Sequence, residues 1–321
     1  MNHLSYRAFF IVPPEVQLLD ISGPAHVFYE AVQYGANITS FFITMNHNSS
    51  TITSSAGMVI HELCSFEDFE LDENDWVFIP GLESRLIFDP EFESQSQPFY
   101  EWLRTQSSNG AKISSVCTGA YLLAQAGLLE GKECTTHWKY IQDFKKRFPK
   151  INLQNDRLFV KDDNIYSSAG VASGIDLSLY ILEELFGPVF ATRIAKEIVV
   201  YLRRAEGDPQ LSVFLQYRNH IENRIHQAQD FIAQKMEDQP TIESLADQVN
   251  MSPRNLTRLF KKTTGITIGQ YTDKLRLERA IQLLSEGQKV ESVSSSCGLS
   301  SPNQLRSLLK KYASVLPSEL S

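Results

Sequence analysis

The sequence predicts an α/β domain, with a mostly parallel sheet between helices, followed by an all-α domain with two helix-turn-helix units. Up to about residue 187, apolar strand-like runs alternate with helical segments, which is typical of a parallel sheet covered on both faces. From about Pro188 the strand patterns stop, and two similar helical units about 50 residues apart complete the chain. At about 100–200 residues per domain, the length of 321 residues also fits two domains.

The elements of the first domain follow from apolar runs of strand length and from apolar residues at helical spacing. Strands are expected at Arg7–Val12, Ile38–Met45, Asp75–Pro80 and Ala111–Val116, with a hairpin from Leu158–Lys161 and Asn164–Ser168. Helices are expected at Pro24–Tyr34, Pro98–Ser107, Thr118–Ala126, His137–Phe148 and Ser173–Phe186. Pro188 to Gln239 is expected to be helical, with a break at Gly207-Asp208-Pro209. We divide the chain into a first domain at 1–190, a helical linker at 191–224 and a second domain at 225–321.

The composition is that of an ordinary globular protein. The chain is 42% hydrophobic and 21% charged, with 16 Gly and 13 Pro, which excludes disordered, collagen-like and coiled-coil classes. It contains no run of about 18 apolar residues, so no membrane span is expected. The four cysteines, Cys64, Cys117, Cys134 and Cys297, are far apart and lack metal-binding spacing. This predicts a reduced, cytoplasmic protein with neither a metal site nor a cofactor.

The net charge is distributed unevenly along the chain. A net charge of -8 argues against nucleic-acid binding when the chain is taken as a whole. Residues 225–321, however, hold 12 Lys and Arg against 10 Asp and Glu, a balance of +2, which leaves -10 for the remainder. The acidity therefore belongs to the first domain, and the second domain is the candidate for binding DNA.

The first helix-turn-helix unit lies at Thr241–Tyr271. Thr241 is expected to cap one helix, and Ser252, followed by Pro253, is expected to cap the next. That second helix carries no acidic residue from Ser252 to Lys262. In a major groove, arginine reads guanine and asparagine reads adenine. The predicted DNA contacts are Arg254, Asn255, Thr257, Arg258, Lys261 and Lys262.

The second unit, Lys289–Leu320, repeats this pattern. Its predicted DNA contacts are Asn303, Gln304, Arg306, Lys310 and Lys311. The alternative for either unit is a solvated basic face on an ordinary pair of helices. Two units that both lack acids on the second helix favour DNA binding.

Residues Ile225–Leu320 resemble the AraC/XylS family of transcription regulators. The matching segments are SLADQVNMSPRNLTRLFKKTTGITIGQY, the connecting KLRLERAIQLL, and CGLSSPNQLRSLLKKY. The resemblance implies that one subunit places two recognition helices in successive major grooves. This sequence departs from the family pattern at Leu299 (usually Phe), Ser314 (usually Gly) and Ser307 (commonly basic) in the second unit, and at Ile268 (usually Pro) in the first. These departures leave the expected fold unchanged and leave the strength of readout by the second unit open.

In the first domain, Lys112–Leu129 runs from a strand into a helix through Cys117. A nucleophile at such a turn is exposed at the sheet edge, and the positive end of the helix is expected to lower the thiol pKa. Gly119 would allow close backbone approach. The alternative is that Cys117 is a small buried hydrophobic residue at a strand end.

The first domain resembles the PfpI/ThiJ superfamily, and the whole chain resembles GlxA-type regulators, which join that domain to an AraC-type module. The motifs are LLDISGPAHVF, FIPGL, VCTGAYLLAQAGLLEGKECTTHW and SAGVASGIDLSLYILEELFG. The resemblance implies a flavodoxin-like, class I glutamine-amidotransferase-like fold. Thr118 occupies the position at which PfpI-type proteases have a histidine, so the protease interpretation lacks its base.

The resemblance also implies roles for five residues of a ligand pocket. Cys117 matches the nucleophile, and Asp20 matches the acid beside it. Gly81 and Thr118 match the backbone positions of an oxyanion hole, and His137 matches a pocket histidine. Each has a structural alternative: Asp20 or His137 as a helix cap, and Gly81 as a turn residue. No catalytic role is assigned, although the set of Asp20, Cys117 and Thr118 is similar to that of isonitrile hydratases.

The expected protein is a sequence-specific DNA-binding regulator whose first domain senses a small nitrogen-containing metabolite and forms a homodimer. Promoter DNA and the effector are the expected partners, with RNA polymerase as a further candidate. The alternatives are a Cys117-dependent hydratase or amidase, and a redox sensor that acts through oxidation of Cys117.

Overall fold

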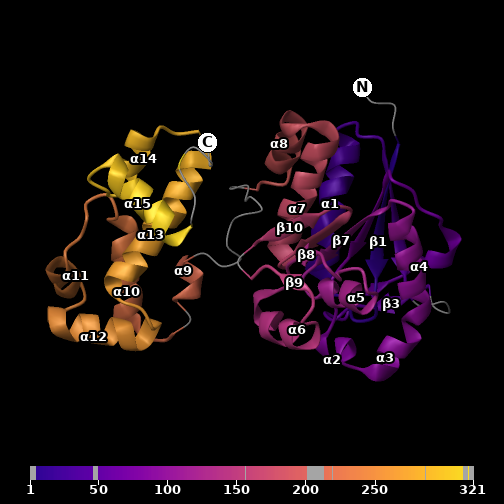
Figure 1. Cartoon of the computed structure of the whole chain (residues 1–321), viewed down its shortest axis with the longest axis horizontal. Coiled ribbons are helices and arrows are strands. Elements are labelled where there is room, and N and C mark those ends of the chain that lie inside the picture. Colours follow the sequence, from indigo (N-terminus) through magenta and orange to yellow (C-terminus); the bar gives the residue numbers. More distant parts are fainter. Residues whose placement is uncertain are drawn as a thin grey trace. The chain divides into compact units, whose positions relative to one another are not determined.

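The computed structural model describes residues 5–45, 50–155, 157–200, 213–218, 220–285, 287–313 and 317. The chain forms two compact units, residues 1–210 and 211–321 (Figure 1). The strands, all in the first unit, are β1 (Tyr6–Val12), β2 (Ile38–Thr44), β3 (Ile52–Thr53), β4 (Val59–Ile60), β5 (Cys64–Ser65), β6 (Asp75–Ile79), β7 (Lys112–Val116), β8 (Glu133–Cys134), β9 (Asn152–Leu153), β10 (Phe159–Asp162) and β11 (Ile165–Ser168).

The first unit also contains eight α-helices and two short 3-10 helices among its described residues. They are α1 (Leu18–Gln33), η1 (Phe66–Asp68), α2 (Ser84–Ile87), α3 (Pro90–Gln95), α4 (Gln97–Ser108), α5 (Gly119–Gln125), η2 (Trp138–Tyr140), α6 (Ile141–Arg147), α7 (Val171–Phe186) and α8 (Pro188–Glu197). The second unit contains α9 (Val213–Gln216), α10 (Asn223–Gln234), α11 (Ile242–Gln248), α12 (Pro253–Thr264), α13 (Ile268–Ser285), α14 (Val290–Ser296) and α15 (Pro302–Tyr312).

The main sheet of the first unit has the strand order β10-β11-β7-β6-β1-β2-β5. Every pairing in it is parallel except the hairpin of β10 with β11. The five longer parallel strands follow the order 2-1-3-4-5 of the flavodoxin-like fold. The predicted fold class of the first domain is therefore confirmed. The carboxyl ends of β1, β6, β7 and β11 all lie at one edge of the sheet.

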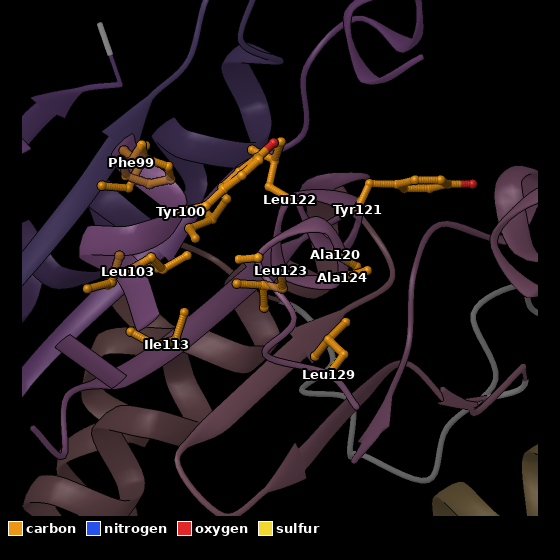
Figure 2. Close-up of a cluster of buried hydrophobic side chains, with 14 of the residues drawn as sticks. Phe99, Tyr100, Leu103, Ile113, Ala120, Tyr121, Leu122, Leu123, Ala124 and Leu129 are labelled. Atoms are coloured by element: carbon orange, nitrogen blue, oxygen red, sulfur yellow. The ribbon is translucent and has the colours of Figure 1, made fainter. Parts of the chain in front are cut away.

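Two hydrophobic cores cover the two faces of this sheet, because alternate residues of each strand point to opposite sides. Along β1, Phe9 and Ile11 join a core with α4, α5 and α6, whereas Phe10 and Val12 join a core with α1, α7 and α8. The strands lie between these two helical layers in Figure 1. Figure 2 shows part of the first core, between α4, α5 and β7.

Helix α1 begins six residues before the predicted start at Pro24. Its first residue is Leu18, its N-cap residue is Gln17, and Pro24 lies inside the helix. A proline there lacks the N–H that would bond to the carbonyl of Asp20, four residues earlier. Close packing of α1 on α7 offsets this loss: a Cβ at Gly23 would lie 3.0 Å from Ile175, and one at Gly174 would lie 3.4 Å from Pro24. Pro24 was therefore a misleading signal for the helix start.

Other elements differ from the sequence prediction in detail. The helix expected at His137–Phe148 is divided into η2 and α6, and His137 is the cap residue before η2. The short strands β3, β4, β5, β8 and β9 were not predicted, since two residues give no periodic pattern. Within the stretch expected to be helical from Pro188, α8 packs against α1 and α7. Residues 201–212 of the predicted linker, with its Gly207-Asp208-Pro209 break, lie outside the described residues.

The second unit is helical throughout its described part and contains two helix pairs joined by α13. The first pair is α11 and α12, whose core includes Leu245, Ala246, Leu256 and Phe260. The second pair is α14 and α15, with a separate core that includes Val293, Leu305 and Leu309. Helix α13 contributes Tyr271 to the first core and Leu284 to the second. The predicted pair of helix-turn-helix units is confirmed.

Candidate functional site

The carboxyl edge of the sheet brings together most of the residues predicted for the ligand pocket. Asp20 lies in the first turn of α1, shortly after β1. Gly81 follows β6, and Cys117 and Thr118 join β7 to α5. Ligands of open α/β sheets bind at this edge. We call the pocket residues Asp20, Gly81, Cys117 and Thr118 the Asp20–Cys117 site.

Cys117 occupies a sharp, strained turn between strand and helix. Its φ is 59°, in the left-handed region that non-glycine residues rarely adopt. Two hydrogen bonds hold this turn: Cys117 N–H donates to the Ser168 carbonyl at 2.9 Å, and Thr136 Oγ1 donates to the Cys117 carbonyl at 3.0 Å. Gly119 makes the turn possible, since a Cβ there would lie 2.2 Å from the Ile79 carbonyl oxygen. The turn has the geometry of a nucleophile elbow.

The Asp20 side chain is buried, with 1% of its surface exposed. One carboxylate oxygen, Oδ2, accepts a hydrogen bond from Gly81 N–H at 3.2 Å. The other, Oδ1, accepts no hydrogen bond of standard geometry among the described residues, and the Cys117 thiol, a weak donor, lies beside the carboxylate. Asp20 does not cap α1, because the helix has already begun at Leu18. The capping alternative is therefore wrong, and Asp20 presents to the site one acceptor without a strong donor.

Burial governs the protonation of both ionisable groups in this site. It raises the pKa of Asp20 to about 6, against the opposing effects of Cys117 and the Gly81 N–H. Burial, followed by the charge of Asp20, raises the pKa of the Cys117 thiol, although the Thr118 backbone N–H acts in the opposite direction. The predicted lowering of the thiol pKa is therefore wrong. The helix end near the sulfur is outweighed by desolvation and by the neighbouring carboxylate.

Gly81 and Thr118 are engaged in the site in a way that the sequence did not predict. Gly81 N–H already donates to Asp20, so in this state it is not a free oxyanion donor. Thr118 Oγ1 accepts from Leu82 N–H at 3.3 Å and donates to the Leu82 carbonyl at 3.4 Å. A Cβ at Gly81 would lie 2.6 Å from Asp20 Oδ2 and 2.7 Å from Thr118 Oγ1. Glycine is needed at position 81 for these groups to meet.

His137 and Cys117 both approach the space beside Gly170 that a side chain at this position would occupy. A Cβ at Gly170 would be 3.9 Å from both Cys117 Sγ and His137 Nε2. His137 Nδ1 accepts from Lys139 N–H at 3.4 Å, so the ring also caps η2, as the structural alternative proposed. Burial, followed by the charge of Lys139, lowers the pKa of His137. The half-buried ring is thus kept neutral, with Nε2 on the side of the site.

Sequence reasoning missed Gly170, where a side chain would contact both Cys117 and His137. Its signal was the glycine directly after the last strand of the sheet, in the segment SAGVASG. Chemically, the whole arrangement offers a buried acceptor at Asp20, a protonated thiol and a neutral imidazole. Among the described residues, no group of three or more His, Cys, Asp or Glu side chains is placed to hold a metal ion.

In the second unit, α12 displays the predicted contacts of the first recognition helix. Ser252 Oγ accepts from Asn255 N–H and caps the helix, as predicted. Leu256 and Phe260 are buried, whereas Arg254, Asn255, Arg258, Lys261 and Lys262 are exposed. The Thr257 hydroxyl donates to the helix carbonyls of Pro253 and Arg254. A groove of about 640 Å³, the first groove, is lined by four cations: Arg254, Arg258, Lys261 and Lys262.

Helix α15 displays the predicted contacts of the second recognition helix. Ser301 caps it, and Leu305 and Leu309 are buried beneath it. Asn303, Gln304, Arg306, Lys310 and Lys311 are all exposed. A groove of about 460 Å³, the second groove, runs between α15 and α13. It is lined by Asp273, Arg276, Leu299, Asn303, Gln304, Ser307, Leu308 and Lys311.

Across the helices of the described ranges, none combines the length and apolar character that a membrane span requires.

Comparison with known proteins identifies both units. Residues 6–184 match the DJ-1/PfpI family, and residues 245–321 match a helix-turn-helix domain. The HTH-type transcriptional regulator CdhR of Pseudomonas aeruginosa is 26% identical over 98% of this chain and 91% of its own length.

Two further relatives match over shorter stretches. The HTH-type transcriptional regulator GbdR of Pseudomonas aeruginosa is 29% identical over 67% of this chain, and the match spans 59% of GbdR. An isonitrile hydratase of Pseudomonas putida is 31% identical over 56% of this chain and 71% of its own length. The chain therefore belongs to the DJ-1/PfpI family, with an AraC-type helix-turn-helix domain following the family domain.

Proposed function

We propose that this protein is a transcription regulator that binds promoter DNA through α12 and α15. The observation that carries the proposal is the pair of exposed, acid-free basic helices, each packed through its opposite face in a helix-turn-helix unit. Four cations around the first groove provide an electrostatic footprint for phosphates. Arg254, Asn255 and Arg258 add side chains that distinguish base edges. The regulators CdhR and GbdR are relatives of this chain.

Loss of Arg254 and Arg258 together is expected to weaken specific DNA binding by at least about 30-fold, since each base-reading side chain contributes about 1–3 kcal/mol. The measurement is a mobility-shift titration of the full chain on duplexes selected from a random pool by the wild type. Arg224→Ala is the matched control, because Arg224 is an exposed arginine of α10 outside both grooves. An Arg254→Ala/Arg258→Ala variant that keeps wild-type preference rules out α12 as a reading helix.

We further infer that the Asp20–Cys117 site senses a small metabolite that carries an N–H donor or a positive charge. Oδ1 of this buried carboxylate has no strong donor beside it, only the weak Cys117 thiol, and a donor on the ligand would satisfy it, which supports this ligand class. Ligand binding regulates DNA binding only if it favours one arrangement of the protein over another. We retain 1–190 as the sensing and dimerisation domain, 191–224 as the linker and 225–321 as the DNA-binding domain. Cytoplasmic localisation and contact with RNA polymerase remain part of the proposal.

We also propose that the first unit forms a homodimer through an apolar groove beside α1. The groove has a volume of about 710 Å³ and lies between α1, β2, β4 and the start of α7. Its large apolar side chains are exposed to solvent: Leu19 by 62%, Tyr29 by 53% and Met58 by 53%. Contiguous apolar surface of this kind marks an interaction site. Because α1 carries both Leu19 and Asp20, a partner subunit here is well placed to respond to ligand.

Leu19→Glu is expected to convert the dimer to a monomer, since it places a charge in a desolvated interface. Sedimentation equilibrium of the full chain at micromolar concentration measures this. Val189→Glu is the control, because Val189 is an exposed apolar residue of α8 that does not line the groove. A wild type that sediments as a monomer, or a Leu19→Glu variant that remains dimeric, contradicts the proposed interface.

A second candidate function is a cysteine-dependent hydratase or amidase, favoured by the elbow geometry of Cys117 and by the relative named isonitrile hydratase. The raised pKa of the thiol makes the regulator the stronger candidate, because the thiolate is the reactive form. The same shift disfavours redox sensing through Cys117. Turnover of an isonitrile by the wild type but not by Cys117→Ala is the result that the hydratase interpretation requires.

A further inference from the structure

The two grooves beside the recognition helices differ in charge. The first groove is lined by four cations and by no acidic residue. The second groove is lined by two cations, Arg276 and Lys311, and by one carboxylate, Asp273. If both grooves face DNA, the second meets the phosphates with a net charge of one rather than four. The contribution of phosphate contacts to affinity grows with the number of phosphates neutralised.

Asp273 lies on α13, the helix that joins the two pairs, and its side chain turns toward the end of α15. Asp273 Oδ2 accepts a hydrogen bond from Tyr312 Oη at 3.1 Å. The same oxygen lies 3.4 Å from Lys311 Nζ, and the two side chains form an ion pair. The Asp273 side chain remains about one-third exposed. The carboxylate is thus held at the rim of the second groove, where it occupies Lys311.

This contact alters what Lys311 can do on a DNA surface. Lys311 is a predicted DNA contact, yet in the free protein it forms an ion pair with Asp273. A lysine that leaves an ion pair to reach a phosphate exchanges one anion for another and so gains little. Asp273 itself then repels the phosphate. The Asn–Arg contacts within the two helices do not distinguish them, because Arg306 donates to Asn303 Oδ1 on α15 and Arg258 donates to Asn255 Oδ1 on α12.

We propose that Asp273 sets the balance between the two reading helices, by neutralising the second groove and leaving α12 as the dominant DNA contact. The inference rests on the proposed DNA-binding function and adds a residue that lies outside both recognition helices. Sequence patterning alone gives no indication of it, because 38 residues separate Asp273 from Lys311.

Asp273→Asn tests this role most directly. The amide oxygen still accepts from Tyr312, so the packing of α13 on α15 is preserved while the charge is removed. We expect affinity for a wild-type-selected duplex to rise about 5–10-fold at 0.1 M salt. The slope of log K against log salt should steepen by about 0.9, the value for one further phosphate contact. Footprinting should show stronger protection of the groove contacted by α15, with unchanged protection where α12 binds.

Two controls make the experiment specific. Asp247→Asn removes the same charge from an exposed position of α11 outside both grooves, and we expect less than about a 2-fold change because distant charges are screened. Lys311→Ala should change wild-type affinity little but should abolish the gain in the Asp273→Asn background. Thermal melts of all variants verify that each is folded.

The outcomes separate the inference from the function on which it rests. Wild-type protein that binds the duplex, with Asp273→Asn unchanged in affinity and slope, overturns the role of Asp273 alone. A gain that persists in Asp273→Asn/Lys311→Ala also overturns it, since Lys311 is then not the released contact. Wild-type protein that shows no saturable binding to any selected duplex overturns the proposed function and, with it, this inference.

Discussion

Replacing Gly119 with alanine is expected to destabilise the first unit by about 3 kcal/mol or more. The new Cβ would lie 2.2 Å from the Ile79 carbonyl oxygen and 2.9 Å from that of Pro80. Both obstacles are backbone atoms at the end of β6, so no side-chain rotation relieves the clash. The segment that must move leads directly into Gly81, and the Gly81 N–H bond to Asp20 would be lost with it. The effect therefore combines strain in the fold with disruption of the site.

Urea unfolding followed by tryptophan fluorescence measures this change, because all three tryptophans, Trp76, Trp102 and Trp138, lie in the first unit. Gly269→Ala is the control: a Cβ at this helical position meets nothing within 4 Å. Because Gly269 lies in the second unit, we expect this variant to leave the tryptophan-detected unfolding of the first unit unchanged. Wild-type stability in Gly119→Ala contradicts the close approach of α5 to β6.

Asp20→Asn is expected to stabilise the first unit at neutral pH and to abolish effector binding. Folding raises the pKa of Asp20 from 3.8 to about 6. The folded state therefore holds the proton more tightly than the unfolded chain. Stability is greatest below about pH 4 and falls as the pH rises through about 6, by about 3 kcal/mol in total. An asparagine avoids that cost, so the variant should gain up to about 3 kcal/mol at pH 7.5 and almost nothing at pH 4.

The matched control is Asp75→Asn, which should have the opposite sign. Asp75 is also buried, but its carboxylate pairs with Arg7 and accepts a hydrogen bond from Asp72 N–H at 2.7 Å. Loss of those charge-assisted bonds is expected to destabilise by about 1–3 kcal/mol. Urea titrations at both pH values provide the comparison. An Asp20→Asn variant that is less stable than the wild type at pH 7.5 contradicts the assignment of a buried, costly carboxylate.

Effector binding supplies the second readout for Asp20→Asn. Amino acids, betaines and small amines are screened by thermal shift. A hit that is then supplied at about 100 times its dissociation constant should stabilise the wild type by about 2.7 kcal/mol. The same compounds should leave Asp20→Asn unshifted. A hit that stabilises both proteins equally places its binding site elsewhere.

Much of the fold and the meeting of the site residues could be predicted, because both depend on patterns local to the sequence. Strand ends of a parallel sheet share one edge, so Asp20, Gly81 and Cys117 could be brought together from their positions after β1, β6 and β7. Helix caps such as Ser252 likewise depend on neighbouring residues. These features follow from periodicity and from the chemistry of short segments.

What could not be predicted depends on distant packing. The direction in which the pKa of Cys117 shifts is set by burial and by Asp20, 97 positions earlier in the chain, rather than by the adjacent helix end. The early start of α1 depends on Gly23 and Gly174, which let a helix with an internal proline pack closely. Asp273, the ion-pair partner of Lys311, lies on α13. No motif in the second helix-turn-helix unit indicates this pairing.

Helix α1 also has a consequence for how this protein changes during evolution. Its first turn carries Leu19 in the apolar groove and Asp20 in the buried site, and Gln17 N–H ties its start to the Gly81 carbonyl at 2.8 Å. A substitution on the outer side of this turn therefore displaces the inner side as well. Substitutions at the surface of this turn are therefore not neutral. Homologues that differ in the apolar groove beside α1 are expected to differ in effector preference, even where every residue of the Asp20–Cys117 site is retained.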